Sequence, residues 1–318
     1  MLSREPEAGT ASARRVALKV DCDTLVGTRE GVPALLEVFA AREICATFFF
    51  TLGPDRSGVA ARRVFTQRGF LRKMLRSRAA SLYGFPTVLY GTLLPAPAIG
   101  ARCEREIRAV AEAGHETGVH GWDHVGWHDG LDRWSLEKIR DQVGRAHEEY
   151  RRILGAPAAA SAAPGWTANA RSLEAEAERE LLYTSNSRGG EPFFPSAGGR
   201  PFRTLEVPST LPTLDETLAW PELPTDAAQR EFYRGAVAGA DVQTLHTVHT
   251  VHAEVEGRSK RGLFEAILDG WIGDGVRFVT LGDVARDVLT RRGSIPVREL
   301  SRTTLPGRGG TVASGWPS

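Results

Sequence analysis

The chain contains only three cysteines in 318 residues. They stand at positions 22, 45 and 103, so they are odd in number and far apart in the sequence. This scarcity argues against a disulfide framework and against a metal cluster built on cysteine. It is typical of a protein of the reducing cytosol.

The first fifteen residues lack the apolar core of a secretory signal peptide. They are polar and rich in Ala and Gly, so we expect a disordered tail over residues 1–15. One catalytic domain is expected over residues 16–290, and a second disordered tail over the Gly-, Arg- and Pro-rich residues 291–318. Because no targeting segment is recognised, we expect a cytoplasmic protein.

Acidic residues are missing from one part of the chain, although its net charge is close to balance at +1. No Asp or Glu occurs from Arg56 to Cys103, while basic residues continue. The uncharged stretch 81–100 contains three prolines and three glycines, which favours an interfacial loop over a spanning helix. A nucleic-acid groove would explain the basic residues but not this apolar stretch, so no nucleic-acid partner is expected.

Within this part, residues 62–76 have the pattern of a basic amphipathic helix. Its apolar residues lie near one side, and its basic residues are Arg68, Arg72, Lys73 and Arg76. We therefore expect an insert over residues 56–100 that contacts lipid at the inner face of the cytoplasmic membrane, with the protein associated peripherally. The alternative is an insertion that packs over the domain and exposes a solvated basic face.

Short β-prone runs alternate with helical patterns along the rest of the chain. Residues 16–20 form the first predicted strand, residues 31–42 a helix and residues 46–52 a second buried strand. Further strands are predicted at 116–120, 181–185, 204–207, 244–251 and 276–281, and further helices at 101–113, 135–153 and 263–272. This order predicts an α/β fold with a parallel, barrel-like sheet in a single domain.

Side chains that bind divalent metals follow two of these strands. Asp21 and Asp23 share one face at the end of the first strand, because strand side chains alternate. His120 and His124 follow another strand, and active sites of such folds lie at these strand ends. Two imidazoles and one carboxylate leave metal positions open for water and substrate. Either pair alone would more often be a cap or a loop feature, but together they favour a metal-dependent hydrolase.

A third histidine belongs to the strand predicted at 244–251. Alternation places His246 and His252 on one face and His249 on the other. His252 falls where the β-branched run gives way to charged residues, which predicts a position at the mouth of the site. It is the natural general acid. The remaining histidines, among them His128, match no strand end and receive no role.

Taken in order, these motifs resemble those of the polysaccharide deacetylases, the family-4 carbohydrate esterases. The segments concerned are Asp21-Cys-Asp23, the His-x-x-x-His pair within residues 115–124, Ala162-Ala-Pro-Gly-Trp166 and the late Val-His252 strand. The resemblance implies a distorted (β/α)7 barrel interrupted by the basic and apolar insert. It implies Asp21 and His252 as catalytic residues and Asp23, His120 and His124 as ligands of a divalent metal ion, most readily zinc.

Longer stretches resemble one activity within that family. Residues 21–31, 70–84, 211–216 and 252–257 look like those of members that remove a formyl group from an amino sugar carried on undecaprenyl phosphate. This resemblance spans residues 16–290. It implies a hydrolase that cleaves an amide C–N bond of 4-deoxy-4-formamido-L-arabinose. The resemblance also implies that the free amine later lowers the negative charge of lipid A and gives resistance to cationic antimicrobial peptides.

One position departs from the family pattern. The family usually has an arginine, paired with the catalytic aspartate, where Ala162 stands here. Arg29 or Arg188 is expected to replace it. We also predict that Arg29, Trp166, Arg188 and Glu254 contact the substrate, with Trp166 stacking on the sugar.

Two other functions stay open at this point. The first is N-deacetylation of peptidoglycan or another amino-sugar glycan, and the second is non-catalytic binding of carbohydrate or lipid. The substrates of such deacetylases are mostly extracytoplasmic, so the missing signal peptide counts against the first. The retained Asp and His residues count against the second.

Overall fold

The computed structural model describes residues 14–59, 89–239 and 247–316. Several expectations lie outside these residues: the tail up to residue 13, His246, and the predicted lipid contacts Arg68, Arg72, Lys73 and Arg76. In the described ranges, no helix combines the length and the apolar character that a membrane crossing requires.

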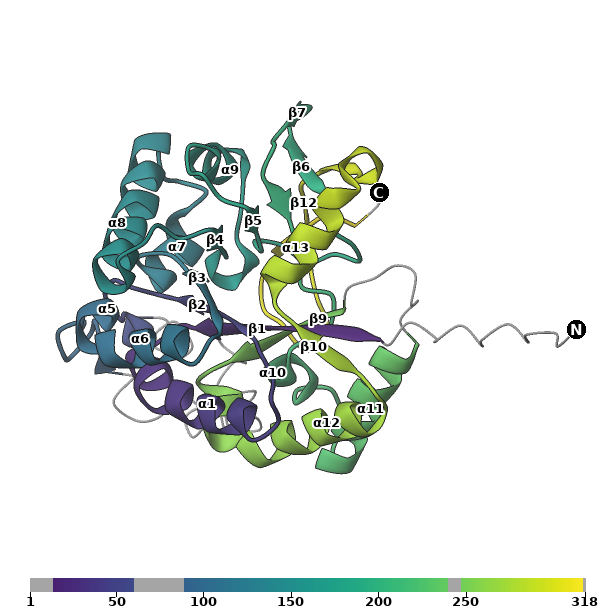
Figure 1. Cartoon of the computed structure of the whole chain (residues 1–318). Coiled ribbons are helices and arrows are strands. Elements are labelled where there is room, and N and C mark those ends of the chain that lie inside the picture. Colours follow the sequence, from purple (N-terminus) through teal and green to yellow (C-terminus); the bar gives the residue numbers. More distant parts are fainter. Residues whose placement is uncertain (1–13, 60–88, 240–246, 317–318) are drawn as a thin grey trace, which may run out of the picture.

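A curled parallel sheet forms the centre of the molecule (Figure 1). Its order is β10-β1-β2-β3-β4-β5-β8, and β9 pairs with the other edge of β1. The bounds are β1 Arg15–Cys22, β2 Thr47–Phe50, β3 Glu116–Val119, β4 Ala160–Ser161, β5 Tyr183–Thr184, β8 Leu205–Glu206, β9 Thr247–His252 and β10 Arg277–Val279. Strands β8 and β9 do not pair. Instead, the backbone N–H groups of Thr210 and Leu211 both donate to Val248 O at 3.1 Å, so irregular chain closes this side.

Helices pack around the outside of the sheet, as Figure 1 shows. The bounds of the helices are α1 Val32–Ala40, α5 Ile99–Arg102, α6 Glu104–Glu112, α7 His124–Gly130, α8 Leu136–Leu154, α9 Ala170–Ala177, α10 Leu214–Thr217, α11 Asp226–Ala238, α12 Arg261–Gly273 and α13 Leu281–Thr290. Short irregular turns of helix are η1 Gly27–Gly31, η3 Pro164–Trp166, η4 Val255–Ser259 and η5 Arg292–Ser294.

Strand β2 shows how the two faces of the sheet are used. Phe48 and Phe50 belong to the core under the helices, whereas Phe49 packs with residues of the barrel interior. The Phe39 ring of α1 lies 6.0 Å from Phe48 and 6.2 Å from Phe264 of α12. A strand buried on both faces carries a continuous apolar run, which explains the Phe-Phe-Phe sequence.

The predicted α/β barrel is confirmed, and each strand of its sheet except β4 was expected from the sequence. Strand β4 has only two residues, in a stretch where the sequence predicts no strand. Two residues are too few to show the alternation by which a strand is recognised.

The prediction of a disordered tail over residues 291–318 is wrong for the described part. Strand β11 (Val297–Glu299) pairs with β6 (Phe194–Ala197), which also pairs with β7 (Arg200–Pro201). Strands β12 (Ser301–Thr303) and β13 (Val312–Ser314) form an antiparallel pair. The backbone of Arg188 then exchanges hydrogen bonds with Ala313 and Gly315, at 2.9 and 3.0 Å. We call residues 297–316 the C-terminal segment.

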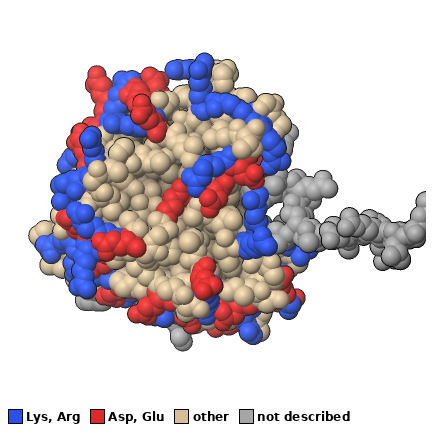
Figure 2. Space-filling model, viewed as in Figure 1, with Lys and Arg blue, Asp and Glu red and all other residues tan. Residues whose placement is uncertain are grey.

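Figure 2 shows how charged side chains are distributed on one face of the molecule. There, Lys and Arg alternate with Asp and Glu around the edge, and other residues form most of the middle.

Candidate active site

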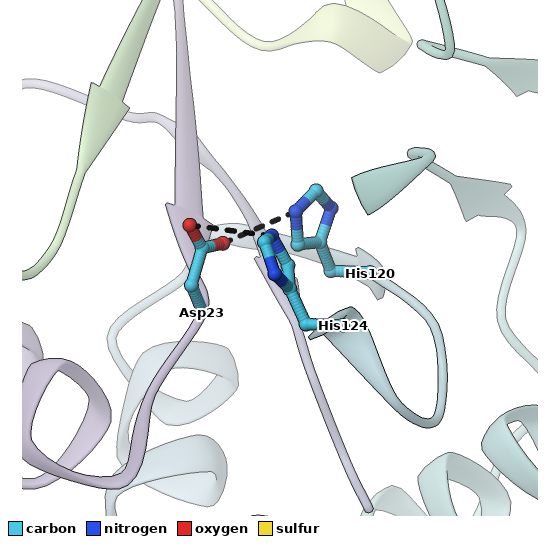
Figure 3. A group of neighbouring side chains, drawn as sticks. All are labelled: Asp23, His120 and His124. Atoms are coloured by element: carbon cyan, nitrogen blue, oxygen red, sulfur yellow. Dashed lines mark ion pairs between the residues drawn. The ribbon is translucent and has the colours of Figure 1, made fainter. Parts of the chain in front are cut away.

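Asp23, His120 and His124 converge at the carboxyl ends of β1 and β3 (Figure 3). Asp23 directly follows β1, His120 directly follows β3, and His124 is the first residue of α7. Both strands pair with β2 in parallel, so their ends meet at one edge of the sheet. The Asp23 carboxylate lies 3.1 Å from His120 Nε2 and 3.4 Å from His124 Nε2. One atom from each of the three residues lies within 4.8 Å of the others.

These three residues fit a divalent metal ion. Oδ1 of Asp23 is buried and has His120 Nε2 beside it at 3.1 Å, and Oδ1 of Asp21 is buried and has no hydrogen-bond partner in the described part of the chain. Burial lowers the pKa of His124 to about 4, so its imidazole is neutral, the form that binds metal. Burial alone would raise the pKa of Asp23, but the imidazoles of His124 and His120 bring it far below its usual value.

Glu254 holds the backbone of the metal-binding loop. Its Oε1 accepts hydrogen bonds from Asp23 N at 2.9 Å, from Thr24 N at 2.8 Å and from Thr24 Oγ1 at 2.8 Å. A side chain on Gly27 would meet this oxygen at 2.0 Å, so the residue there must be glycine. Glu254 is fully buried. The prediction that it contacts substrate is therefore wrong, and its role is to position Asp23.

Lys19 is the partner of Asp21. Its Nζ donates to Asp21 Oδ2 at 2.9 Å, and the side chains are 0% and 4% exposed. The two residues are two apart on β1, so they share a face and can pair along the strand. The ammonium also lies 5.1 Å from the Trp166 ring. Lys19 was not predicted as a site residue. A lysine in an otherwise apolar strand could have indicated a buried ion pair.

Neither arginine expected to pair with Asp21 does so. Arg29 is exposed on η1 and lies beside Cys103, away from the pocket. Arg188 is buried, where its Nη1 donates to both oxygens of Glu216 at 3.0 and 3.2 Å. Neither side chain lines the pocket, so the predicted substrate contacts of both residues are wrong as well.

Trp166 lies at the wall of the site, packed against several of its residues. Its side chain is nearly buried, at 2% exposure, and its Nε1 donates to Ser209 Oγ at 2.9 Å. The guanidinium groups of Arg188 and Arg308 lie 4.8 and 4.6 Å from its ring centroid. Its ring edge meets His252, with the centroids 6.1 Å apart. Trp166 also lines the candidate pocket, and its stacking on the sugar stays a prediction.

His252 lies at the end of β9, in register with Asp21 on the adjacent strand. Its Nδ1 is 3.2 Å from Oδ1 of Asp215 on α10. Burial opposes protonation of His252, but the Asp215 carboxylate raises the pKa of His252 well above the usual value. Asp215 was not predicted as a site residue, because the sequence predicts no helix or strand over α10 that would place it near His252.

His249 points away from the site, as strand alternation predicted. It is buried between Tyr233 and Trp271, with ring centroids 4.9 and 5.6 Å away. Burial lowers the pKa of His249 to about 3.

The site residues line one pocket. It is lined by Asp21, His252 and the three candidate metal ligands, and also by His128, Asp129 and Arg308. No role was predicted for His128. Its place follows from α7, which carries it one turn beyond His124.

Together, the curled parallel sheet and the Asp, His, His set at its carboxyl edge define a metal-dependent hydrolase. The chain belongs to the polysaccharide deacetylase family, whose model matches residues 8–183. This family is metal-dependent, and the Asp23, His120 and His124 set is the candidate metal site of this chain.

Similar proteins agree with this assignment. A protein of Shewanella sediminis named "Probable 4-deoxy-4-formamido-L-arabinose-phosphoundecaprenol deformylase ArnD" is 37% identical over 80% of this chain and 80% of its own length. A protein of the same name from Wigglesworthia glossinidia brevipalpis is 32% identical over 91% of this chain and 98% of its own. A solved structure titled "Crystal structure of putative polysaccharide deacetylase from Mycobacterium smegmatis" has a TM-score of 0.63 at 18% identity, over 96% of this chain and 99% of that chain, which supports the fold.

The pairing of Lys19 with Asp21 can be tested by a double-mutant cycle. Lys19→Met should lower the free energy of unfolding by about 3–5 kcal/mol, because it leaves the buried Asp21 carboxylate without its cation. Adding Asp21→Asn should recover most of this loss. Urea unfolding of the single and double variants measures both effects.

Lys138→Met is the matched control, since that ion pair with Asp141 is half-exposed. It should change stability little. If the double variant is as unstable as the sum of the two single variants, Lys19 and Asp21 are not coupled.

Proposed function

We propose that this chain is a metal-dependent deformylase. Its substrate would be 4-deoxy-4-formamido-L-arabinose carried on undecaprenyl phosphate, and its products formate and the lipid-linked 4-amino sugar. The two curated relatives that bear this name support the substrate. The observation that carries the chemistry is the placement of Asp21 and His252 in register on adjacent strands, beside the candidate metal ligands.

Each group has one task in this proposal. A divalent cation held by Asp23, His120 and His124, most readily zinc, would polarise the formyl carbonyl and the attacking water. Asp21, held in place by Lys19, takes the proton from the water. His252 donates a proton to the departing nitrogen.

The substrate also implies a place of action. The lipid keeps the sugar at the membrane, and we propose peripheral association with the inner face of the cytoplasmic membrane. Arg68, Arg72, Lys73 and Arg76 stay the predicted lipid contacts. The amine produced is the group that later lowers the charge of lipid A and gives resistance to cationic antimicrobial peptides.

Formate release tests the proposed activity. The purified protein should release formate from the 4-formamido form of the lipid-linked sugar and act far more slowly on the 4-acetamido form. Asp21→Asn serves as the inactive control. Acetate release at an equal or higher rate would instead indicate an N-deacetylase, and a metal-bound protein that cleaves neither would indicate a binding protein.

Metal affinity and catalytic rate should separate by residue. Asp23→Ala, His120→Ala and His124→Ala should lose both bound metal and turnover, because a ligand supplies affinity. Asp21→Asn should keep the metal and lose about a hundred- to ten-thousand-fold in rate, as expected for a general base. Elemental analysis beside formate assays checks this. If Asp21→Asn lost the metal and Asp23→Ala kept it, Asp21 would be the ligand and Asp23 the general base.

The alkaline limb of the rate profile should depend on the pair of His252 and Asp215. Since Asp215 raises the pKa of His252, the acid stays protonated at neutral pH, and the rate falls only as pH rises through that raised value. Asp215→Asn removes the negative charge, so the limb should move to lower pH. The measurement is kcat/KM against pH.

His249→Ala is the control on the opposite face of β9. It should lower stability by opening a cavity between Tyr233 and Trp271, yet leave the alkaline limb in place. An equal shift of the limb in both variants would show that His252 is not the titrating group.

A further inference from the structure

The C-terminal segment places one arginine in the active-site pocket. Between β12 and β13, the chain turns at residues 304–311, and Arg308 of this turn lines the same pocket as Asp21, Asp23 and His252. Its side chain is 18% exposed. A guanidinium therefore stands at the pocket although no expected catalytic step uses it.

The position of Arg308 is fixed by its surroundings. Its Nη2 donates to Gly165 O at 3.2 Å, and its guanidinium lies 4.6 Å from the Trp166 ring centroid. The residue before it, Gly307, has φ 81° and approaches α10 so closely that a Cβ would meet Glu216 O at 2.4 Å. Only glycine fits this backbone, which delivers the arginine to the pocket.

The charge of Arg308 is only partly balanced in the described part of the chain. The carboxylate of Glu216 lies 3.7 Å away, too far for a hydrogen bond. That carboxylate already accepts from Arg188 Nη1 at 3.0 and 3.2 Å and from Thr213 N at 3.0 Å. Two guanidinium groups thus share the Glu216 carboxylate. Asp215, which lines the same pocket, interacts with Arg308 through its charge, and no carboxylate forms a hydrogen bond with Arg308 in the described part of the chain.

We propose that Arg308 binds the phosphodiester anion that joins the sugar to its lipid. This inference rests on the proposed function and adds a second subsite to it. A guanidinium that has no hydrogen-bonded carboxylate can bind phosphate oxygens with two parallel hydrogen bonds. The C-terminal segment then holds the substrate at its phosphate while the formamide lies at the candidate metal ligands.

This subsite gives the enzyme a means to select its substrate. A neutral glycan offers nothing for Arg308 to bind, and it would leave the guanidinium facing uncharged groups. The phosphate-linked sugar supplies an anion that pairs with the guanidinium. Arg308 therefore determines specificity without touching the reacting amide.

Two soluble substrates test the proposal: a short-chain alkyl phosphodiester of the formamido sugar, and its neutral methyl glycoside. Arg308→Gln should lower kcat/KM for the phosphodiester about ten- to a hundred-fold, mostly through KM, as expected for a lost charged hydrogen bond. Its effect on kcat/KM for the neutral glycoside should be at least ten-fold smaller than its effect on the phosphodiester. Arg308→Lys keeps the charge without the planar donor pair. Its kcat/KM for the phosphodiester should lie between those of the wild type and Arg308→Gln.

Arg302→Gln is the matched control from the same segment, because Arg302 pairs with Asp132 at the surface. Its kcat/KM for both substrates should equal that of the wild type. If Arg308→Gln slows both substrates equally, or neither, the proposal is overturned.

Binding measured without turnover separates this proposal from the proposed function. By calorimetry, a short dialkyl phosphate should bind the metal-loaded wild type and Arg302→Gln, and bind Arg308→Gln about ten-fold or more weakly. Equal binding to all three overturns the phosphate subsite. If the wild type releases no formate from either sugar, the proposed function fails, and the calorimetry still decides the role of Arg308.

Discussion

The site depends on the face of β1 that carries Lys19, Asp21 and, directly after the strand, Asp23. Because side chains alternate, these residues follow one another along one face, which is buried in the barrel. The neighbouring strands align their ends with it. Strand β3 delivers His120 through β2, and β9 delivers His252 in register with Asp21.

Burying so many ionisable groups is costly unless each is satisfied. The structure meets this requirement with local partners: Lys19 for Asp21, Asp215 for His252, and backbone N–H groups for Glu254. Each pair fixes the orientation of a group before a substrate binds. Preorganised charges of this kind do not have to reorient during the reaction, which is the main electrostatic advantage of an enzyme site.

The surroundings of the site also depend on the C-terminal segment. It pairs with β6 through β11 and with the backbone of Arg188 through Ala313 and Gly315, so it is part of the domain. From this position it completes the cationic surroundings of Trp166. The packing links the pocket to the last residues of the chain, which were expected to lie apart from it.

The sequence by itself determined every strand of the sheet except β4, and the convergence of Asp23, His120 and His124. Alternation and strand ends are local features, and parallel pairing brings strand ends to one edge. Only the tertiary structure decided the partners: Lys19 in place of Arg29 or Arg188, and Asp215 for His252. It also turned Trp166 and Glu254 inward and brought Arg308 to the pocket. A side chain's partner depends on which distant segments pack against it and exclude water, and no local pattern encodes that.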